Sequence, residues 1–284
     1  MNGGQCMFYR KYQPSSLLSP FVECYFIWDS EGPLKEAMVV ESPPNGFCSI
    51  VFNYGQPYYL QNKKYERLAV PSQFISGQNI YTYKLFLEGT IGMAGIVFKP
   101  AALATIFGLS VYEYTEERVD LHKVFKNDIV DNYASQIKAG NEEERIWSLE
   151  EFIMTQYRIR QPQTDYIDHA ANFIVEQNGM LRVADLLKDS CMSRRTFERK
   201  FFQKVGLSPK YYARIRRIGY LLNLAAGKKK VDWAKLFYDC EFYDQAHFIK
   251  DFEEFTGRTP QQYLKENTEL ANYVEKPKMK RSNS

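Results

Sequence analysis

The sequence predicts an α+β fold, in which a β-rich amino-terminal domain is followed by an all-α carboxyl-terminal domain. The chain has 284 residues and 45% hydrophobic content, which is enough for two hydrophobic cores. Short β-rich runs separated by turn residues come first, and amphipathic helical patterns follow. The two parts also differ in charge. Residues 1–160 carry 15 Lys and Arg against 18 Asp and Glu, whereas residues 161–284 carry 22 Lys and Arg against 16 Asp and Glu. The second part is therefore the one suited to a polyanionic partner.

The amino-terminal domain is expected over residues 8–158, as a cupin-like fold or a β-sandwich with added helices. Its strand patterns are separated by turn segments such as residues 42–46 and 76–79. The four expected strands cover residues 21–28, 47–54, 81–88 and 92–99. Two helices are expected after them, over residues 126–139 and 142–157.

One face of the second expected helix is apolar, with Ile146, Leu149, Ile153 and Tyr157 at helical spacing. This stripe either packs against the β-rich domain or forms a contact with a second copy of the chain. Aromatic residues are abundant in the strands, and alternation places about half of them inside the domain. There they either fill the core or line a pocket for an apolar or sugar-like effector.

No catalytic or metal-binding constellation is indicated, so the chain is not expected to be an enzyme or to need a cofactor. His122 is the one histidine in the first 160 residues, too few for the clustered ligands of a metal-dependent cupin. It is expected instead at a loop or a helix end. The five cysteines form no C-x-x-C pair, and neither a signal peptide nor a membrane span is indicated. The expected location is the cytoplasm, with no membrane partner.

A polar stretch over residues 159–164 contains Pro162 and is expected to link the two domains. A helical DNA-binding domain is then expected over residues 165–268. The basic residues 269–284 lack core-forming side chains and are expected to form a disordered tail.

A first helix-turn-helix pattern places its second helix directly after Ser193, whose hydroxyl is suited to cap the helix. Phe197, Phe201 and Val205 recur every four residues and are expected to face the core. Gly206 then ends the helix.

The outward face of this helix is basic, which suits it to the major groove of DNA. Residues 182–217 hold 11 basic against 3 acidic side chains. Arginine pairs bidentately with guanine, and glutamate accepts a hydrogen bond from cytosine. The residues expected to contact DNA here are Ser193, Arg194, Arg195, Glu198, Arg199, Lys200 and Lys204. The alternative is a solvated basic face on an ordinary helical domain.

The same pattern recurs after an amphipathic connecting helix that begins at Pro209. The first helix of this second unit is marked by Trp233, Leu236 and Phe237, and the second helix by Phe248, Phe252 and Phe255. Asp244 is the expected N-cap of that second helix. Residues 231–266 hold 4 basic and 8 acidic side chains, so attraction to phosphates is expected mainly from the first unit.

Two helix-turn-helix units joined by one long helix resemble the carboxyl-terminal module of the AraC/XylS family of transcription regulators. The segments that carry the resemblance are SRRTFERKF at 193–201, GLSPKYY at 206–212, DQAHFIKDF at 244–252 and TGRTPQQY at 256–263. The resemblance implies that Arg195, Glu198 and Arg199 read bases in the first recognition helix. In the second recognition helix, the matching positions are Gln245, Ala246, His247 and Lys250.

Four positions depart from the family's pattern. Leu187 and Phe237 stand where a small residue is usual, and Ser190 stands where an apolar residue is usual. Glu241 replaces the usual turn glycine and is expected to adopt a positive φ, at a cost of about 1 kcal/mol.

The expected function is that of a sequence-specific DNA-binding transcription regulator, with activation as the expected effect, that responds to a small-molecule effector bound by the amino-terminal domain. The segment GMAGIVFKP at 92–100 is similar to an uncharacterised sensor domain found in some members of the family. The alternative is a regulator whose amino-terminal domain serves only oligomerisation or partner binding. The expected partners are double-stranded DNA, the effector, a second copy of the chain and RNA polymerase.

Overall fold

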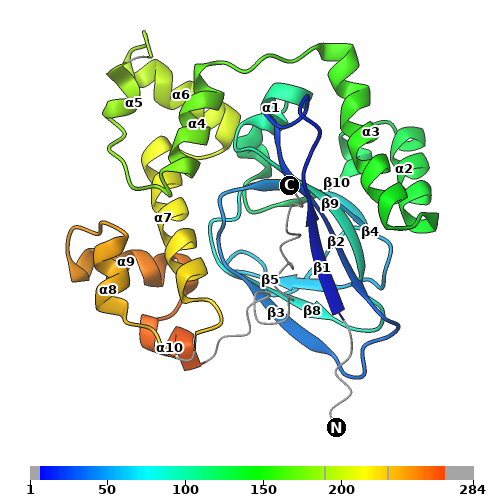
Figure 1. Cartoon of the computed structure of the whole chain (residues 1–284), viewed down its shortest axis with the longest axis horizontal. Helices are drawn as coiled ribbons and strands as arrows, with labels where there is room; N and C mark the ends of the chain where they lie inside the picture. Colours follow the sequence, from blue (N-terminus) through cyan, green and yellow to red (C-terminus); the bar gives the residue numbers. More distant parts are fainter. Residues whose placement is uncertain (1–6, 189, 229, 266–284) are drawn as a thin grey trace, which may run out of the picture.

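The computed structural model describes residues 7–188, 190–228 and 230–265 (Figure 1). A β-rich amino-terminal part and a helical carboxyl-terminal part lie next to each other, which confirms the expected α+β fold. The tail expected over residues 269–284 lies outside the described residues.

Two antiparallel sheets form the amino-terminal part. The six-stranded sheet contains, in spatial order, β1 (Met7–Tyr12), β2 (Val22–Ser30), β9 (Gly92–Phe98), β4 (Cys48–Asn53), β7 (Gln73–Ser76) and β10 (Arg118–Asp120). The four-stranded sheet contains, in spatial order, β3 (Met38–Ser42), β8 (Tyr83–Leu87), β5 (Tyr59–Gln61) and β6 (Leu68–Ala69). The four strands expected from the sequence are confirmed as β2, β4, β8 and β9. The other strands are additional to them.

Side chains along the strands alternate between two hydrophobic cores. On β4, Ile50 and Phe52 point to one face of the six-stranded sheet, whereas Val51 points to the other. Val51 belongs to the core between the sheets, together with Val40 of β3 and Leu87 of β8. The aromatic residues Phe26, Trp28, Tyr58 and Phe74 belong to the same core. These rings therefore fill the space between the sheets.

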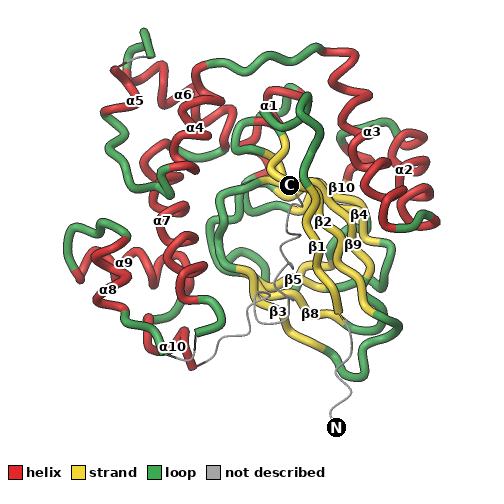
Figure 2. Tube along the Cα trace, viewed as in Figure 1, coloured by secondary structure: helices red, strands yellow, loops and turns green. Residues whose placement is uncertain are grey.

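Three helices cover the outer face of the six-stranded sheet: α1 (Ala102–Phe107), α2 (Asn127–Ala139) and α3 (Glu142–Arg160). Figure 2 shows α2 and α3 beside the strands of this sheet. Leu149 and Ile153 of α3 are fully buried in this core. The apolar stripe of α3 therefore packs against the β-rich part, as the first of the two alternatives predicts.

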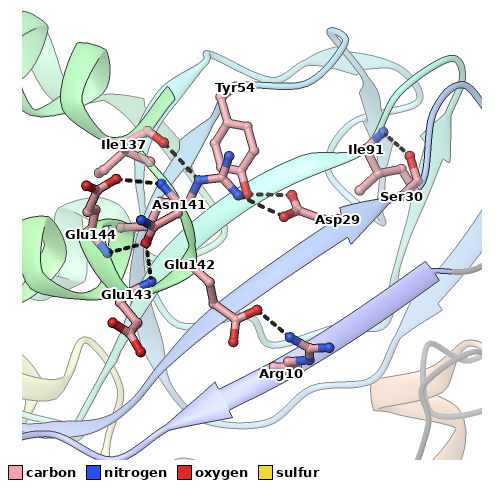
Figure 3. Close-up of polar contacts among 11 residues, drawn as sticks. Arg10, Asp29, Ser30, Tyr54, Ile91, Ile137, Asn141, Glu142, Glu143 and Glu144 are labelled. Carbon is pink, nitrogen blue, oxygen red and sulfur yellow. Dashed lines mark hydrogen bonds and ion pairs between the residues drawn. The ribbon is translucent and has the colours of Figure 1, made fainter. Parts of the chain in front are cut away.

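A polar cluster fixes the beginning of α3 to the sheet (Figure 3). The side chain of Asn141 accepts hydrogen bonds from the first turn of α3 and so caps the helix. One turn further, Arg145 Nη1 donates to Asp29 Oδ2 on β2 at 2.8 Å. Glu142 forms an ion pair with Arg10 on β1. The helix thus has a fixed starting point relative to two neighbouring strands.

His122 lies in a short 3₁₀ helix, Leu121–Lys123, which agrees with its expected place at a helix end. Its Nε2 lies 3.0 Å from Asp131 Oδ1, and its Nδ1 lies 2.7 Å from Asp120 Oδ1. Two hydrogen bonds raise the pKa of His122: the one with Asp131 has the larger effect, and the one with Asp120 the next largest. These contacts give the ring a structural role beside β10.

The carboxyl-terminal part is helical and shares one hydrophobic core. Its helices are α4 (Tyr166–Glu176), α5 (Asp185–Lys188), α6 (Arg194–Val205), α7 (Pro209–Ala225), α8 (Trp233–Asp239), α9 (Gln245–Thr256) and α10 (Pro260–Lys265). The long helix α7 joins α5 and α6 at one end to α8 and α9 at the other (Figure 1). In the described parts of the chain, none of the helices combines the length and the apolar character that crossing a bilayer requires.

Candidate nucleic-acid interface

The helices α6 and α9 are built in the same way. Each has 12 residues and ends at a glycine in the left-handed conformation, Gly206 with φ 89° and Gly257 with φ 72°. Each begins with a side-chain cap, because Ser193 accepts a hydrogen bond from the backbone of Thr196, and Asp244 accepts one from that of His247. The expected caps are confirmed, and α6 and α9 are equivalent parts of two units.

The turn before each of these helices contains a residue with positive φ, but at a different distance from the cap. Glu241 has φ 53°, as the sequence predicts for a residue in place of a glycine. Cys191 has φ 50° in the first unit, which the sequence pattern did not predict. A positive φ costs a non-glycine residue about 1 kcal/mol, so both turns are held by the packing around them.

The inner face of α6 anchors the helix, and its outer face is cationic. Phe197, Phe201 and Val205 are fully buried, as expected. Arg195 and Arg199 are exposed on the opposite side. The other expected contact residues near them are Arg194 and Lys200, which are also exposed, and Glu198, which is half-buried. Arg194 Nε donates to Glu198 Oε1 at 2.9 Å, so this pair partly neutralises its own charge.

Lys204 lies one turn after Lys200 and on a different side of α6 from Arg195 and Arg199. Its ammonium lies 2.7 Å from Asp168 Oδ2 and 2.9 Å from Asp165 Oδ2, at the beginning of α4. It also donates to Thr105 Oγ1 on α1 at 3.2 Å. The charge of Lys204 is therefore compensated inside the protein, at the contact between the helical part and the β-rich part.

Three arginines of α7 are likewise engaged within the protein. Arg214 forms ion pairs with two carboxylates of α9. Arg216 donates to a backbone carbonyl of the amino-terminal domain, and Arg217 donates to the Gly179 carbonyl at 2.9 Å. The basic residues counted over 182–217 are therefore not one continuous surface for phosphates.

The outer face of α9 is much less cationic than that of α6. Phe248, Phe252 and Phe255 are buried, as expected. The expected contact residues Gln245, Ala246 and Lys250 are exposed. His247 is half-exposed, and its Nε2 lies 3.8 Å from Asp251 Oδ1. This ring therefore lies beside a buried carboxylate of its own helix.

The amino-terminal domain contacts the connecting helix between the two units. Tyr212 Oη donates to the Gly46 carbonyl at 2.6 Å. The guanidinium of Arg216 lies 4.5 Å from the centre of the Phe47 ring. Gly219 approaches the same loop so closely that a Cβ there would lie 2.7 Å from the Pro44 carbonyl oxygen. The loop between β3 and β4 thus rests directly on α7.

The same domain also contacts both units. At the second unit, Glu41 and Arg258 form an ion pair in which the carboxylate side chain is only 1% exposed. The Thr82 N–H donates to the Phe255 carbonyl at 2.9 Å. At the first unit, Thr115 Oγ1 donates to the Gly206 carbonyl at 3.3 Å. The sequence patterns do not reveal these contacts, because each joins residues far apart in the chain.

Comparisons with known protein families match two separate segments of the chain. Residues 186–266 match a family described as "Helix-turn-helix domain", and residues 10–120 match one described as "Domain of unknown function (DUF6597)". No curated protein matches the sequence.

Several solved structures are similar to this chain at low sequence identity. Apo ToxT from Vibrio cholerae, in a variant form, is 13% identical, with 90% of this chain and 98% of that chain covered and a TM-score of 0.45. Unsaturated fatty acid-bound ToxT from Vibrio cholerae is 14% identical, with 83% and 96% covered and a TM-score of 0.41. The AraC-like transcriptional activator CuxR is 13% identical, with 81% and 100% covered and a TM-score of 0.31.

Proposed function

We propose that this chain is a DNA-binding transcription regulator whose helices α6 and α9 both enter the major groove of its operator, because residues 186–266 match a helix-turn-helix family. The observation that carries this proposal is the exposed arginine face at the beginning of α6. The side chains of Arg195 and Arg199 project from a helix whose opposite face is fully buried, so the helix presents them rigidly.

The proposed DNA contacts follow the exposed residues of the two helices. They are Ser193, Arg194, Arg195, Glu198, Arg199 and Lys200 on the first unit, and Gln245, Ala246, His247 and Lys250 on the second. Lys204 is left out of this set, because its ammonium is paired with Asp165 and Asp168.

Arg195→Ala and Arg199→Ala are each expected to weaken discrimination between operator and random duplex by about 5- to 150-fold, since a bidentate contact to a base contributes about 1–3 kcal/mol. The measurement is a fluorescence anisotropy titration at one salt concentration, with circular dichroism to confirm an intact fold. Lys138→Ala, an exposed residue of α2, removes the same charge and should leave discrimination unchanged. Equal discrimination in wild type and both arginine variants would remove these residues from the proposed contacts.

We further propose that the amino-terminal domain controls DNA binding in response to a small-molecule effector. Support comes from its contacts, because this domain touches the first unit, the connecting helix and the second unit at separate points. A ligand that shifts the loop between β3 and β4, or the residues before β8, would act directly on α7 and α9. A domain that served only oligomerisation would have no need of these contacts.

Loosening the contact with α7 should therefore alter DNA affinity without touching a DNA-facing residue. The double variant Tyr212→Phe and Arg216→Ala removes two contacts to the loop over residues 44–47. We expect its affinity for operator DNA to fall about fivefold or more, because two units held less rigidly lose more conformational freedom on binding. Unchanged affinity would favour the alternative role in oligomerisation alone. A rise in affinity would still support regulation by the amino-terminal domain, but it would show that the contacts with α7 weaken DNA binding.

A further inference from the structure

We propose that the two recognition helices read operator segments of different base composition, with α6 selecting G·C pairs and α9 selecting A·T pairs. This inference rests on the proposed entry of both helices into the major groove. It adds the chemistry of each half of the operator, which follows from comparing the two helices position by position.

The helices α6 and α9 have the same length and the same distance from cap to final glycine. Residues at the same distance from the N-cap therefore occupy equivalent places. The equivalent pairs are Arg194 with Gln245, Arg195 with Ala246, Glu198 with Ile249, and Arg199 with Lys250. At three of these four places, a charged side chain on α6 is replaced by a neutral one on α9.

On α6, the groups that can reach base edges are suited to G·C pairs. Arg195 and Arg199 lie one helical turn apart and are both exposed. A guanidinium offers a planar pair of donors that matches the N7 and O6 acceptors of guanine. Glu198 lies between them in sequence and can accept a hydrogen bond from the cytosine amino group. Its carboxylate also accepts a hydrogen bond from Arg194.

On α9, the corresponding groups are suited to A·T pairs. The exposed methyl group of Ala246 can contact the C5-methyl group of thymine, and the half-buried Ile249 extends the same apolar surface. The Gln245 side chain is exposed and carries both a donor and an acceptor, which matches N7 and N6 of adenine. No side chain at these three positions is a cation.

Lys250 is the remaining exposed cation on this face of α9. Its single ammonium lies at the end of a flexible stem and lacks the planar fork of arginine, so we assign it to a phosphate. Acidic residues outnumber basic ones in this unit, 8 to 4 over residues 231–266. The second unit therefore gains little from phosphates, and contacts with base edges have to supply more of its binding.

The test is selection of operator sequences by the full chain from a pool of random duplexes, followed by sequencing. Wild type should enrich two segments whose centres lie about 10 base pairs apart, one centred on guanine and the other on adenine and thymine. Arg199→Ala should lose guanine preference at one position of the first segment and leave the second segment unchanged. Ala246→Arg places the α6 group on α9, and should raise guanine in the second segment about fivefold or more.

Ala234→Arg is the matched control for added charge, because it lies exposed on α8 of the same unit. It should leave the composition of both segments unchanged. Three results would each overturn this inference. They are enrichment of guanine in both segments by wild type, enrichment of one segment alone, and identical profiles for Ala246→Arg and Ala234→Arg. Absence of any enriched sequence would instead overturn the proposed function itself.

Discussion

Replacing Arg214 with methionine is expected to lower the free energy of unfolding by about 3–5 kcal/mol, because it leaves a buried carboxylate without its partner. Arg214 Nη2 lies 2.7 Å from Asp251 Oδ1, and the Asp251 side chain is only 1% exposed. The same guanidinium lies 2.5 Å from Glu254 Oε2. Methionine retains the apolar stem and removes the charge. The loss of unfolding free energy therefore comes mainly from the unpaired carboxylates and less from lost packing.

The measurement is denaturant unfolding followed by circular dichroism at about pH 7. Lys210→Met, at an exposed position of the same helix, is the control and should change stability by less than about 0.5 kcal/mol. A loss below about 1 kcal/mol for Arg214→Met would show that other groups compensate Asp251.

Acid should weaken the same cluster in wild type. Burial acts to raise the pKa of Glu254, but the hydrogen bond from Tyr211 and the charge of Arg214 outweigh it and hold this pKa below its usual value. A carboxylate with a lowered pKa contributes stability above its unfolded-state pKa and loses that contribution as pH falls through its folded-state pKa. Arg214→Met should therefore lose less stability than wild type between about pH 5 and pH 3.

Phe252→Ala is expected to cost about 3–5 kcal/mol, through lost burial and the cavity that remains. Phe252 is fully buried, and its ring centre lies 5.3 Å from that of Trp233 and 5.5 Å from that of Tyr263. The ring therefore joins α8, α9 and α10, and its removal should lower the melting temperature and abolish operator binding together.

Phe202→Ala is the matched control, because Phe202 lies on the equivalent helix but is 44% exposed and stacks on Tyr112. It should destabilise the protein by about 1 kcal/mol or less. If Phe252→Ala melted like wild type, the packing of α9 against α8 and α10 would be wrong.

Several features of the helical part could be predicted because their signals are local in the sequence. A capping residue, phenylalanines four positions apart and a final glycine lie within one helix, so they identify α6 and α9 without any distant contact. The positive φ at Glu241 agrees with its place in the AraC/XylS resemblance, where a turn glycine is usual. In the β-rich part, the strands β2, β4, β8 and β9 are also visible as local patterns.

Other strands depend on pairing with distant partners. β10 has 3 residues and becomes a strand by pairing with β7, about forty residues earlier in the chain. β6 has 2 residues and pairs with β5. Runs this short carry no alternation that a sequence pattern could detect.

The two helix-turn-helix units and the basic character of the first follow from the sequence alone, because both are properties of neighbouring residues. Which of those basic side chains are exposed depends on contacts that form when the chain folds. Arg195 and Lys204 look alike in the sequence, yet one is exposed and the other is paired with Asp168. A charge is compensated only by groups within a few ångströms, and folding brings those groups from distant parts of the chain.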